Sequence, residues 1–321
     1  MKFTTRAYNS FSINKNHNST LFKISNEKKL LDEIKYFENL PEELSIYFPR
    51  YIQNGSSLKK PYRLEIEYYA YSNLGSEMLN EKFNFDNWNS IFEFIFNYIE
   101  NYKLCKSVPS NKTELKKMLI DKTYSEYKKL LIQNKFFDKF SKYEYIYFND
   151  KKLLNFEKIW DKISEFILRT NFGKKFYYIH GDLCFSNILY SKNKYNNDII
   201  LKFIDPRGKF GDKYFYGDIY YDLAKLSHSV NGGYEYLIYD KFKMKLNKNR
   251  LLLDYENNNK VEIYNVLLSK FENYNYNLEV IKLIEGLIYI GMCARHYDSL
   301  SRQKAMYSIG LKLLNEVYEQ I

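Results

Sequence analysis

The pattern of hydrophobic and polar residues predicts a small sheet in the first part of the chain. Short aromatic and β-branched runs fall within residues 3–24 and 62–69, and a polar stretch at 14–19 separates two of them. Such runs around a polar turn are typical of antiparallel strands. Between the two regions, apolar residues at helical spacing predict a helix over residues 26–39, for which Ser25 is the expected N-cap.

Helical periodicity dominates the rest of the chain. Broad apolar faces at a spacing of three to four residues predict helices in several long segments. A β-rich patch at 242–255 interrupts them. Strands gathered in one part of a chain and helices in another are typical of an α+β fold. The predicted helical segments are 85–106, 110–142, 154–170, 278–297 and 301–320.

Composition indicates an ordered globular protein with one large domain or two lobes. The chain has 321 residues, of which 45% are hydrophobic and 19% aromatic, and these fractions exclude a disordered chain. Its three cysteines, Cys105, Cys184 and Cys293, form no Cys-x-x-Cys pair, so neither a disulfide framework nor a zinc site is expected. Because no apolar run reaches the length of a membrane-spanning helix or a signal peptide core, we expect a cytoplasmic protein.

The formal net charge of +10 is compatible with nucleic acid, an anionic membrane surface or small anionic substrates as partners. The lysines are scattered along the chain and form no block of five or six like charges. A scattered distribution favours a solvated surface over a nucleic-acid interface, so no nucleic-acid partner is expected. The same positive field would favour the binding of a polyanionic nucleotide.

The candidate chemistry is concentrated in residues 178–205. Two short β-rich runs around a polar turn predict a hairpin over residues 188–204. Asp182 and Asn187 precede this hairpin, and Asp205 follows it directly. Because a hairpin brings its two ends together, we expect these three side chains to converge on one small volume.

Two carboxylates and an amide oxygen in one volume suit a hard cation such as Mg²⁺, which commonly binds one or two carboxylates together with substrate phosphates. One of the carboxylates can instead accept a proton from an attacking hydroxyl. This division of roles is that of a phosphoryl-transfer site, with Asp182 as the base, Asn187 five residues later, and Asp205 as the metal ligand after the hairpin.

The order of these residues resembles a known family. H-G-D-x-x-x-x-N at 180–187, followed by I-D at 204–205, is similar to the motif of the aminoglycoside phosphotransferase and choline kinase family. G-D at 217–218 and Y-D-L-A-K-L at 221–226 resemble the family's G-D-x-x-x-D-L-A segment. The resemblance extends over nearly the whole chain, but its specific motifs are confined to 178–226.

The resemblance implies a two-lobed protein-kinase-like fold of the α+β class. Residues 1–70 would form a β-rich nucleotide-binding lobe, and residues 71–321 a mainly helical lobe with the catalytic and acceptor-binding groups. Asp182 would take the proton of a small-molecule hydroxyl. Asn187 and Asp205 would hold Mg²⁺ against the phosphates of ATP, with GTP as an alternative donor.

Nucleotide-binding residues follow from the same resemblance. Lys23 lies in a run similar to the kinase strand whose lysine contacts phosphate, and Glu33, on the next helix, would form the ion pair that positions it. The alternative is a surface Lys23 and an unrelated helix-edge Glu33. Because no G-x-G-x-x-G motif is present, Ser19 is assigned to phosphate contact only by analogy. Backbone groups near Glu67 and Tyr68, at the expected hinge, would meet adenine.

Four further residues are expected to support the site. His180 would order the catalytic loop through hydrogen bonds. Arg207 would contact phosphate or an anionic acceptor, or else form a structural salt bridge. Asp218 and Asp222 flank the start of a predicted helix, where a carboxylate acts as a cap and dipole partner, so a structural role is favoured for both.

The acceptor is less well defined by the sequence. A choline-type substrate calls for an acidic or aromatic cage and an aminoglycoside for an acidic pocket, whereas this chain is basic. The sequence therefore favours an uncharged or anionic small molecule, such as a sugar or sugar acid, with aminoglycoside or choline and ethanolamine kinases as the alternative. Two other classes stay open: a nucleotide-binding pseudokinase that serves as a binding module, and a nucleic-acid-binding protein suggested by the charge alone.

Overall fold

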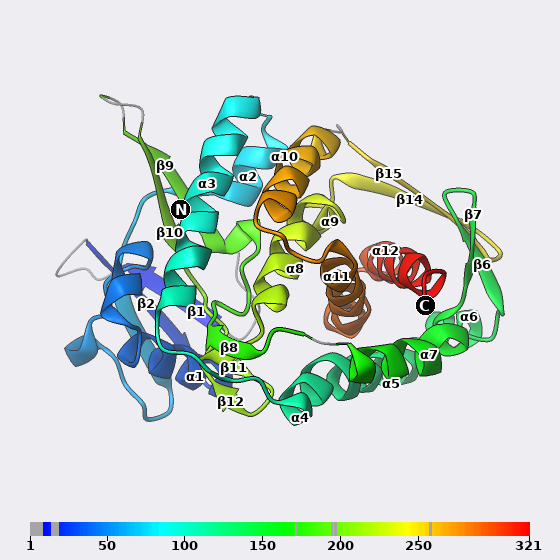
Figure 1. Ribbon diagram of the computed structural model, residues 1–321, viewed down its shortest axis with the longest axis horizontal. Helices are drawn as coiled ribbons and strands as arrows, with labels where there is room; N and C mark the ends of the chain where they lie inside the picture. Colours follow the sequence, from blue (N-terminus) through cyan, green and yellow to red (C-terminus); the bar gives the residue numbers. More distant parts are fainter. Residues whose placement is uncertain are drawn as a thin grey trace. The chain divides into compact units, whose positions relative to one another are not determined.

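The computed structural model of the chain divides into two compact units, each built from two separate stretches of sequence (Figure 1). Unit 1 comprises the described residues of 1–108 and 175–217, and unit 2 those of 109–174 and 218–321. The start of the first expected β-rich run and residues 14–18 of the expected turn lie outside the described residues. The described residues are 9–13, 19–81, 83–170, 172–193, 195, 198–256 and 259–321.

Unit 1 contains the small antiparallel sheet that the sequence predicts. Its strands are β1 (Asn9–Ile13), β2 (Thr20–Ser25) and β3 (Tyr62–Glu67), in the order β1-β2-β3. The register sets Lys23 of the central strand opposite Leu64 of β3. Lys23 is thus held on the central strand, with paired backbone on both sides.

The helix predicted over residues 26–39, after strand β2, is α1 (Lys28–Glu38). It begins after Glu27, so the expectation that Ser25 is the N-cap is wrong. The Ser25 hydroxyl instead accepts a hydrogen bond from the backbone N–H of Glu27 at 3.1 Å, which shapes the turn between strand and helix. The Ser25 hydroxyl therefore forms its hydrogen bond before the first turn of the helix, because Ser25 is still the last residue of β2.

The hairpin predicted around the candidate chemistry is confirmed. Strands β9 (Ile188–Lys192) and β10 (Ile199–Phe203) pair antiparallel, with Ile188 opposite Phe203. A two-residue strand, β4 (Ser72–Asn73), pairs with β9 on its other side and gives the order β10-β9-β4. The residues just before and just after the hairpin therefore leave it at the same end.

Strand β8 (Lys175–Tyr178), which leads into the candidate catalytic loop, is bonded to α1 within unit 1. The hydroxyl of Tyr178 donates a hydrogen bond to the carbonyl oxygen of Tyr36 at 2.6 Å, and the two ring centroids lie 4.7 Å apart. This contact joins the helix that follows the first sheet to the strand that leads into the candidate catalytic loop. The remaining elements of this stretch of chain are α2 (Leu74–Leu79), α3 (Phe85–Leu104), β5 (Val108–Pro109), β11 (Lys209–Phe210), β12 (Lys213–Tyr214) and β13 (Tyr216–Gly217).

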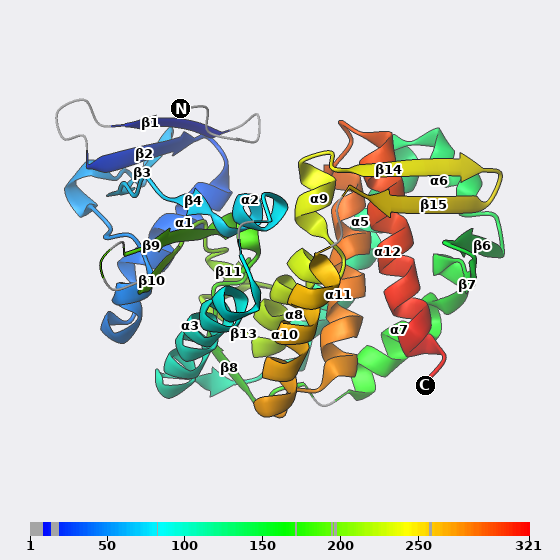
Figure 2. The ribbon, with the colours of Figure 1, turned by 90° about the horizontal axis from the view of Figure 1, so that it is seen from above.

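Unit 2 is mainly helical. Helix α11 (Leu278–Met292) packs along α12 (Leu300–Tyr318) (Figure 2). Helix α11 lies within the predicted segment 278–297, and α12 begins one residue before the predicted segment 301–320. A Cβ atom on Gly286 would lie 2.9 Å from the side chain of Leu314 and 3.2 Å from the backbone oxygen of Gly310, so this crossing depends on small residues. None of the described helices in either unit is long and apolar enough to cross a membrane. The other helices of unit 2 are α4 (Lys112–Leu115), α5 (Lys122–Gln133), α6 (Lys135–Phe140), α7 (Phe156–Arg169), α8 (Ile219–Val230), α9 (Tyr234–Ile238) and α10 (Lys260–Asn273), with a π-helical turn at Lys116–Asp121.

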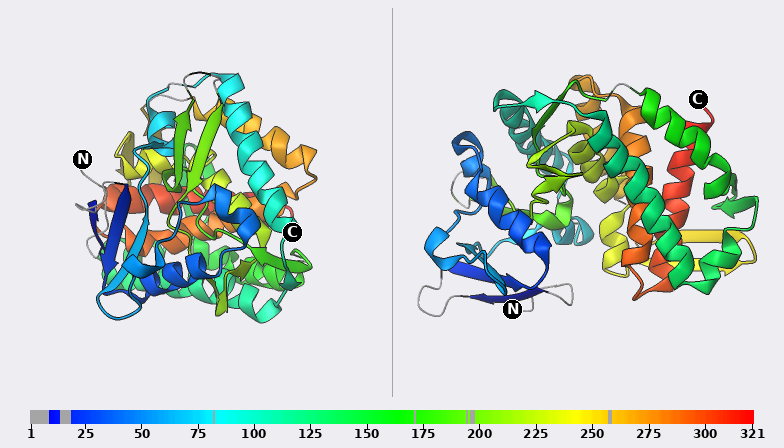
Figure 3. Two further views of the ribbon diagram at one scale, coloured as in Figure 1. Left: turned by 90° about the vertical axis from the view of Figure 1, so that its left-hand side faces the viewer. Right: turned by 90° about the horizontal axis from the view of Figure 1, so that it is seen from below.

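A four-stranded sheet completes unit 2. The β-rich patch predicted at 242–255 is confirmed as the hairpin of β14 (Phe242–Asn247) and β15 (Arg250–Tyr255), drawn in yellow in Figure 3. It joins β6 (Tyr145–Phe148) and β7 (Lys151–Leu154) in the order β14-β15-β6-β7. The pairing of β15 with β6 is parallel, whereas the other two pairings are antiparallel.

Candidate active site

Lys23 forms the centre of the candidate site through two ion pairs. Its Nζ lies 2.6 Å from Oε2 of Glu33 and 2.7 Å from Oδ1 of Asp205. Lys23 and Glu33 are buried, whereas the side chain of Asp205 remains 43% exposed. The ion pair expected between Lys23 and Glu33 is therefore present, and it is joined by the carboxylate that follows the hairpin.

Burial acts against the charges of Lys23 and Glu33. Burial by itself lowers the pKa of Lys23, but the attraction of Asp205 and Glu33 outweighs it, and the pKa is raised. Burial raises the pKa of Glu33 to about 7, against the opposing attraction of Lys23. The Glu33 carboxylate thus depends on the ammonium group of Lys23 to remain ionised.

The catalytic loop holds Asp182 and Asn187 together. A short 3-10 turn, Phe185–Asn187, closes the loop, and the side-chain Nδ2 of Asn187 donates to the backbone oxygen of Asp182 at 2.9 Å. The backbone N–H of Ile204 donates to the carbonyl oxygen of Asn187 at 3.0 Å. Since Asp205 is the next residue, this bond brings it beside the loop.

His180 ties the same loop to the end of β10. Its Nδ1 accepts a hydrogen bond from the backbone N–H of Asp182 at 3.2 Å, and its Nε2 lies 3.0 Å from the carbonyl oxygen of Ile204. These two partners require the neutral tautomer with the proton on Nε2. The ring is fully buried and stacks on Phe48 at a centroid distance of 6.0 Å. Phe48 had no sequence signal that linked it to the site.

The segment after Asp205 packs against α1. Asp205 has a left-handed backbone with φ of 57°, and the backbone N–H of Arg207 donates to the carbonyl oxygen of His180 at 2.8 Å. Gly208 follows with φ of 71°, and a Cβ atom there would lie 2.2 Å from the backbone oxygen of Asp32. Sequence reasoning missed Gly208, although a glycine three residues after the expected metal ligand was the available signal.

The backbone N–H groups of Glu67 and Tyr68, at the expected hinge, already have hydrogen-bond acceptors. The N–H of Tyr68 donates to the carbonyl oxygen of Ser19 at 2.7 Å, and that of Glu67 donates to the carbonyl oxygen of Arg50 at 2.9 Å. Both amide donors are thus engaged inside unit 1. A contact of this segment with adenine would use other backbone groups, and it stays a prediction.

Asp218 and Asp222 belong to unit 2, at the start of α8. Asp218 is the N-cap: its carboxylate accepts hydrogen bonds from the backbone N–H groups of Tyr220 at 2.9 Å and Gly173 at 3.1 Å. Burial raises the pKa of this carboxyl to about 6, although both hydrogen bonds act in the opposite direction. Asp222 is buried in the first helical turn.

The donor atoms in unit 1 fit a nucleotide-bound Mg²⁺ better than an all-protein metal site. Within the described ranges, no cluster of three or more His, Cys, Asp or Glu residues is arranged to hold a metal. Asp182, Asn187 and Asp205 offer two carboxylates and, because the Asn187 amide nitrogen is engaged, one amide oxygen. Mg²⁺ usually keeps several waters and adds one or two carboxylates and substrate phosphates. Apart from Asp218 and Asp222, unit 1 also contains all of the other predicted site residues: Ser19, Lys23, Glu33, Glu67, Tyr68, His180 and Arg207.

Among the solved structures that match this chain are small-molecule kinases. A glucosamine kinase in complex with glucosamine, ADP and inorganic phosphate matches with a TM-score of 0.51 at 8% identity, over 97% of this chain and 79% of that one. A mutant aminoglycoside 2′-phosphotransferase-IIIa in its GDP complex matches with a TM-score of 0.52 at 13% identity, over 99% and 90%. No family model and no curated protein matches the chain. The chain therefore has the α+β, protein-kinase-like fold of the small-molecule kinases, as its resemblance to the aminoglycoside phosphotransferase and choline kinase family predicted.

Proposed function

We propose that the protein is a kinase that transfers the terminal phosphoryl group of ATP, or of GTP, to a hydroxyl group of a small molecule. The observation that carries this proposal is the position of Lys23, whose ammonium group bridges Glu33 and Asp205 in one buried cluster. A buried cation held beside a partly exposed carboxylate is suited to a polyanionic ligand that brings a divalent metal.

In this proposal Lys23 binds the phosphates of the nucleotide, and Glu33 positions it. The ammonium group stays charged because its pKa is raised by the two carboxylates. Glu33 holds the lysine from α1, and α1 is fixed by the Tyr178 and Gly208 contacts. The position of the helix therefore controls the position of the cation.

Asp182 is the proposed catalytic base. Its carboxylate accepts the proton of the acceptor hydroxyl as the oxygen attacks the terminal phosphorus. The new bond joins that oxygen to phosphorus, the bond to the bridging oxygen of the nucleotide breaks, and the nucleoside diphosphate leaves. The loop hydrogen bonds through His180 and Asn187 hold Asp182 in place for this step.

Asn187 and Asp205 are the residues that would hold Mg²⁺. The metal, when bound with the nucleotide, neutralises the charge that develops on the phosphate oxygens. Asp205 retains 43% side-chain exposure, which leaves its carboxylate accessible to a ligand. Its left-handed backbone turns the chain away immediately after this position, toward α1.

The acceptor is proposed to be a sugar or sugar-like metabolite. The basic chain does not favour a cationic acceptor. One of the solved structures with this fold is described as a complex with glucosamine, which supports a sugar-like acceptor but not a neutral one, because the amine of glucosamine is largely protonated near pH 7. Residues 1–70 would supply the nucleotide lobe and residues 71–321 the catalytic and acceptor groups. A cytoplasmic site of action suits both the nucleotide donor and the described cysteines, which form no disulfide.

The test is product formation from pooled metabolites. Purified protein would be incubated with ATP or GTP and Mg²⁺ and with separate pools of sugars, amino sugars, amino alcohols, nucleosides and aminoglycosides. Mass spectrometry would detect a product that gains one phosphate. We expect the sugar or amino-sugar pool to yield it. Nucleotide binding without a product from any pool would favour a pseudokinase that serves as a binding module, and absence of nucleotide binding would contradict the proposal.

A further inference from the structure

Strand β14 forms one edge of the four-stranded sheet in unit 2. The strand order β14-β15-β6-β7 leaves its outer side without a partner strand among the described residues. All six of its residues are exposed or half-buried, whereas Leu251 and Leu253 of the neighbouring β15 are only 1% and 7% exposed. The long hairpin of β14 and β15 is visible in Figure 2.

The pairing register shows which backbone groups point outward. The backbone N–H of Glu256 donates to the carbonyl oxygen of Lys241 at 3.0 Å, which makes these two residues a hydrogen-bonded pair. Hydrogen-bonded and outward-directed residues alternate along an antiparallel strand. The N–H and C=O groups of Phe242, Met244 and Leu246 are therefore directed away from β15, in the direction in which a further strand would add.

The two faces of β14 differ in chemistry. Phe242, Met244 and Leu246 share the face of the buried leucines of β15, yet they are half-exposed, and Leu246 is 36% exposed. Lys243 and Lys245 point to the opposite face and are exposed. An added strand would therefore cover apolar side chains on one face and place its other side chains beside two lysines.

The two lysines and the outward backbone groups of β14 together indicate which kind of molecule would bind at this edge. A second copy of β14, paired antiparallel, would set the cations of Lys243 and Lys245 against one another, and like charges on facing strands are destabilising. Nucleic acid would satisfy the lysines, but it has no peptide groups to bond the outward N–H and C=O groups. An acidic polypeptide satisfies both.

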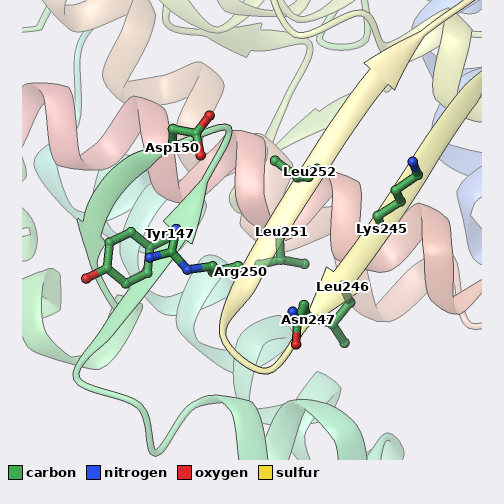
Figure 4. A pocket seen from close by; sticks show the side chains of 8 residues that line it. All are labelled: Tyr147, Asp150, Lys245, Leu246, Asn247, Arg250, Leu251 and Leu252. Carbon is green, nitrogen blue, oxygen red and sulfur yellow. The ribbon is translucent and has the colours of Figure 1, made fainter.

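A hollow of about 600 Å³ lies beside the turn of the same hairpin (Figure 4). The residues that line it include Tyr147, Asp150, Lys245, Leu246, Arg250 and Leu252. The guanidinium carbon of Arg250 lies 4.3 Å from the centre of the Tyr147 ring, and Leu252 is 47% exposed. Two cationic groups face one carboxylate in a largely apolar lining, so the hollow suits an apolar side chain next to a carboxylate.

We propose that β14 is a docking edge for an extended protein segment in which acidic and apolar side chains alternate. The segment adds as a fifth strand: its backbone bonds the outward groups of β14, its carboxylates face Lys243 and Lys245, and an apolar side chain enters the hollow. This site is built entirely from unit 2 and is independent of the phosphotransfer reaction.

The experiment measures the binding of a fluorescein-labelled peptide of about eight residues with alternating glutamate and isoleucine or valine. Fluorescence anisotropy would follow its titration with the full chain. The matched control is the same peptide with alternate backbone amides N-methylated on its bonding edge, which keeps every charge and removes the hydrogen-bond donors. We expect the unmethylated peptide to bind and the methylated peptide to lose binding.

Protein variants locate the site. Lys243→Glu combined with Lys245→Glu should weaken peptide binding by about tenfold or more, since two favourable cross-strand pairs become repulsive. Lys129→Glu, an exposed lysine on α5, should leave binding within about twofold. Met244→Pro removes one outward N–H that the β14–β15 ladder does not use, and should also weaken binding.

Three results would overturn the proposal. One is no binding at millimolar peptide, and another is binding that survives N-methylation. The third is equal loss of affinity in the lysine double variant and in the Lys129 control, because the attraction would then depend on net charge alone. An oligonucleotide that binds with the same dependence on Lys243 and Lys245, where the peptide does not, would assign the face to nucleic acid instead.

Discussion

The ammonium group of Lys23 donates a hydrogen bond to Oδ1 of Asp205 at 2.7 Å, although the two residues are 182 positions apart in sequence. The same nitrogen lies 2.6 Å from Glu33, so a strand, a helix and the segment after the β9–β10 hairpin meet at one cation. Because Lys23 and Glu33 are both buried, the ion pair at the candidate site is also part of the interior of unit 1.

Lys23→Met should destabilise the protein strongly. It leaves the buried carboxylate of Glu33 without a cation, and breaking a buried ion pair from one side costs about 3–5 kcal/mol in the free energy of unfolding. Lys23→Met combined with Glu33→Leu should recover part of that loss, because the unpaired carboxylate is gone. Urea denaturation of the two variants tests this order.

The matched control for this prediction is Lys116→Met in unit 2. Lys116 pairs with Asp121 at 2.7 Å, but the two side chains are 50% and 49% exposed. Exposed pairs of this kind contribute at most about 1 kcal/mol. If Lys116→Met costs as much as Lys23→Met, or if the double variant is no more stable than the single one, the buried pair does not have the assigned role.

Asp205→Asn should separate metal binding from nucleotide binding. The variant keeps an oxygen that can accept from Lys23 and loses the charge that would hold Mg²⁺. Nucleotide affinity measured by calorimetry should fall when Mg²⁺ is present and change little when it is absent, and turnover should fall by about a hundredfold or more. Chelation of Mg²⁺ should stop turnover of the wild-type protein; turnover that continues in excess chelator would argue against the metal role of Asp205.

Gly208→Ala should disturb α1. The new methyl group would lie 2.2 Å from the backbone oxygen of Asp32, and the residue has φ of 71°. Gly211→Ala is the control, because Gly211 has a similar φ of 60° and lies in the turn between β11 and β12. This variant should lose only the roughly 1–2 kcal/mol that left-handed backbone costs an alanine. Thermal unfolding and nucleotide affinity should both suffer more in Gly208→Ala. Equal losses of thermal stability and nucleotide affinity in the two variants would show that the contact of residue 208 with α1 is not the cause.

Glu285 should make stability depend on pH. It is fully buried in α11, and burial raises its pKa to about 7, although hydrogen bonds from Ser227 and Asn231 act in the opposite direction. Since the pKa is higher in the folded than in the unfolded state, the free energy of unfolding should fall as pH rises from about 4.5 to about 7, by up to about 3 kcal/mol.

Glu285→Gln tests this dependence. The variant keeps the shape and cannot ionise, so it should be more stable than the wild type at pH 8, with the advantage shrinking toward pH 4.5. Denaturant midpoints across this range provide the comparison. A wild-type protein that is equally stable at both ends of the range, or a variant with an unchanged slope, would show that Glu285 does not carry the effect.

Local features of the fold could be predicted because the spacing of apolar residues indicates which face of a helix or strand is buried. The apolar face of α1, the β9–β10 hairpin and the long helices α11 and α12 all follow from periodicity and turn residues. The proximity of the segments that carry Asp182, Asn187 and Asp205 followed from spacing, since the three residues flank one short hairpin, and their roles stay a prediction. The exact start of α1 did not follow, because Ser25 is still part of strand β2.

Features that depend on packing between distant segments could not be predicted. The stacking of Phe48 on His180 joins residues from separate parts of the chain and leaves no local pattern. The close approach of Gly208 to α1 has the same origin. The compact units divide the chain after residues 108, 174 and 217. The lobe boundary near residue 70 was inferred from the resemblance and stays a prediction.

The most direct test of the central claim compares the wild type with Asp182→Asn for nucleotide binding and for phosphorylation of the acceptor found in the metabolite pools. The account predicts that Asp182→Asn binds nucleotide and Mg²⁺ like the wild type and forms the phosphorylated product about 10²–10⁴ times more slowly, because it lacks the base that accepts the hydroxyl proton. Equal rates of product formation in the two proteins would contradict the account.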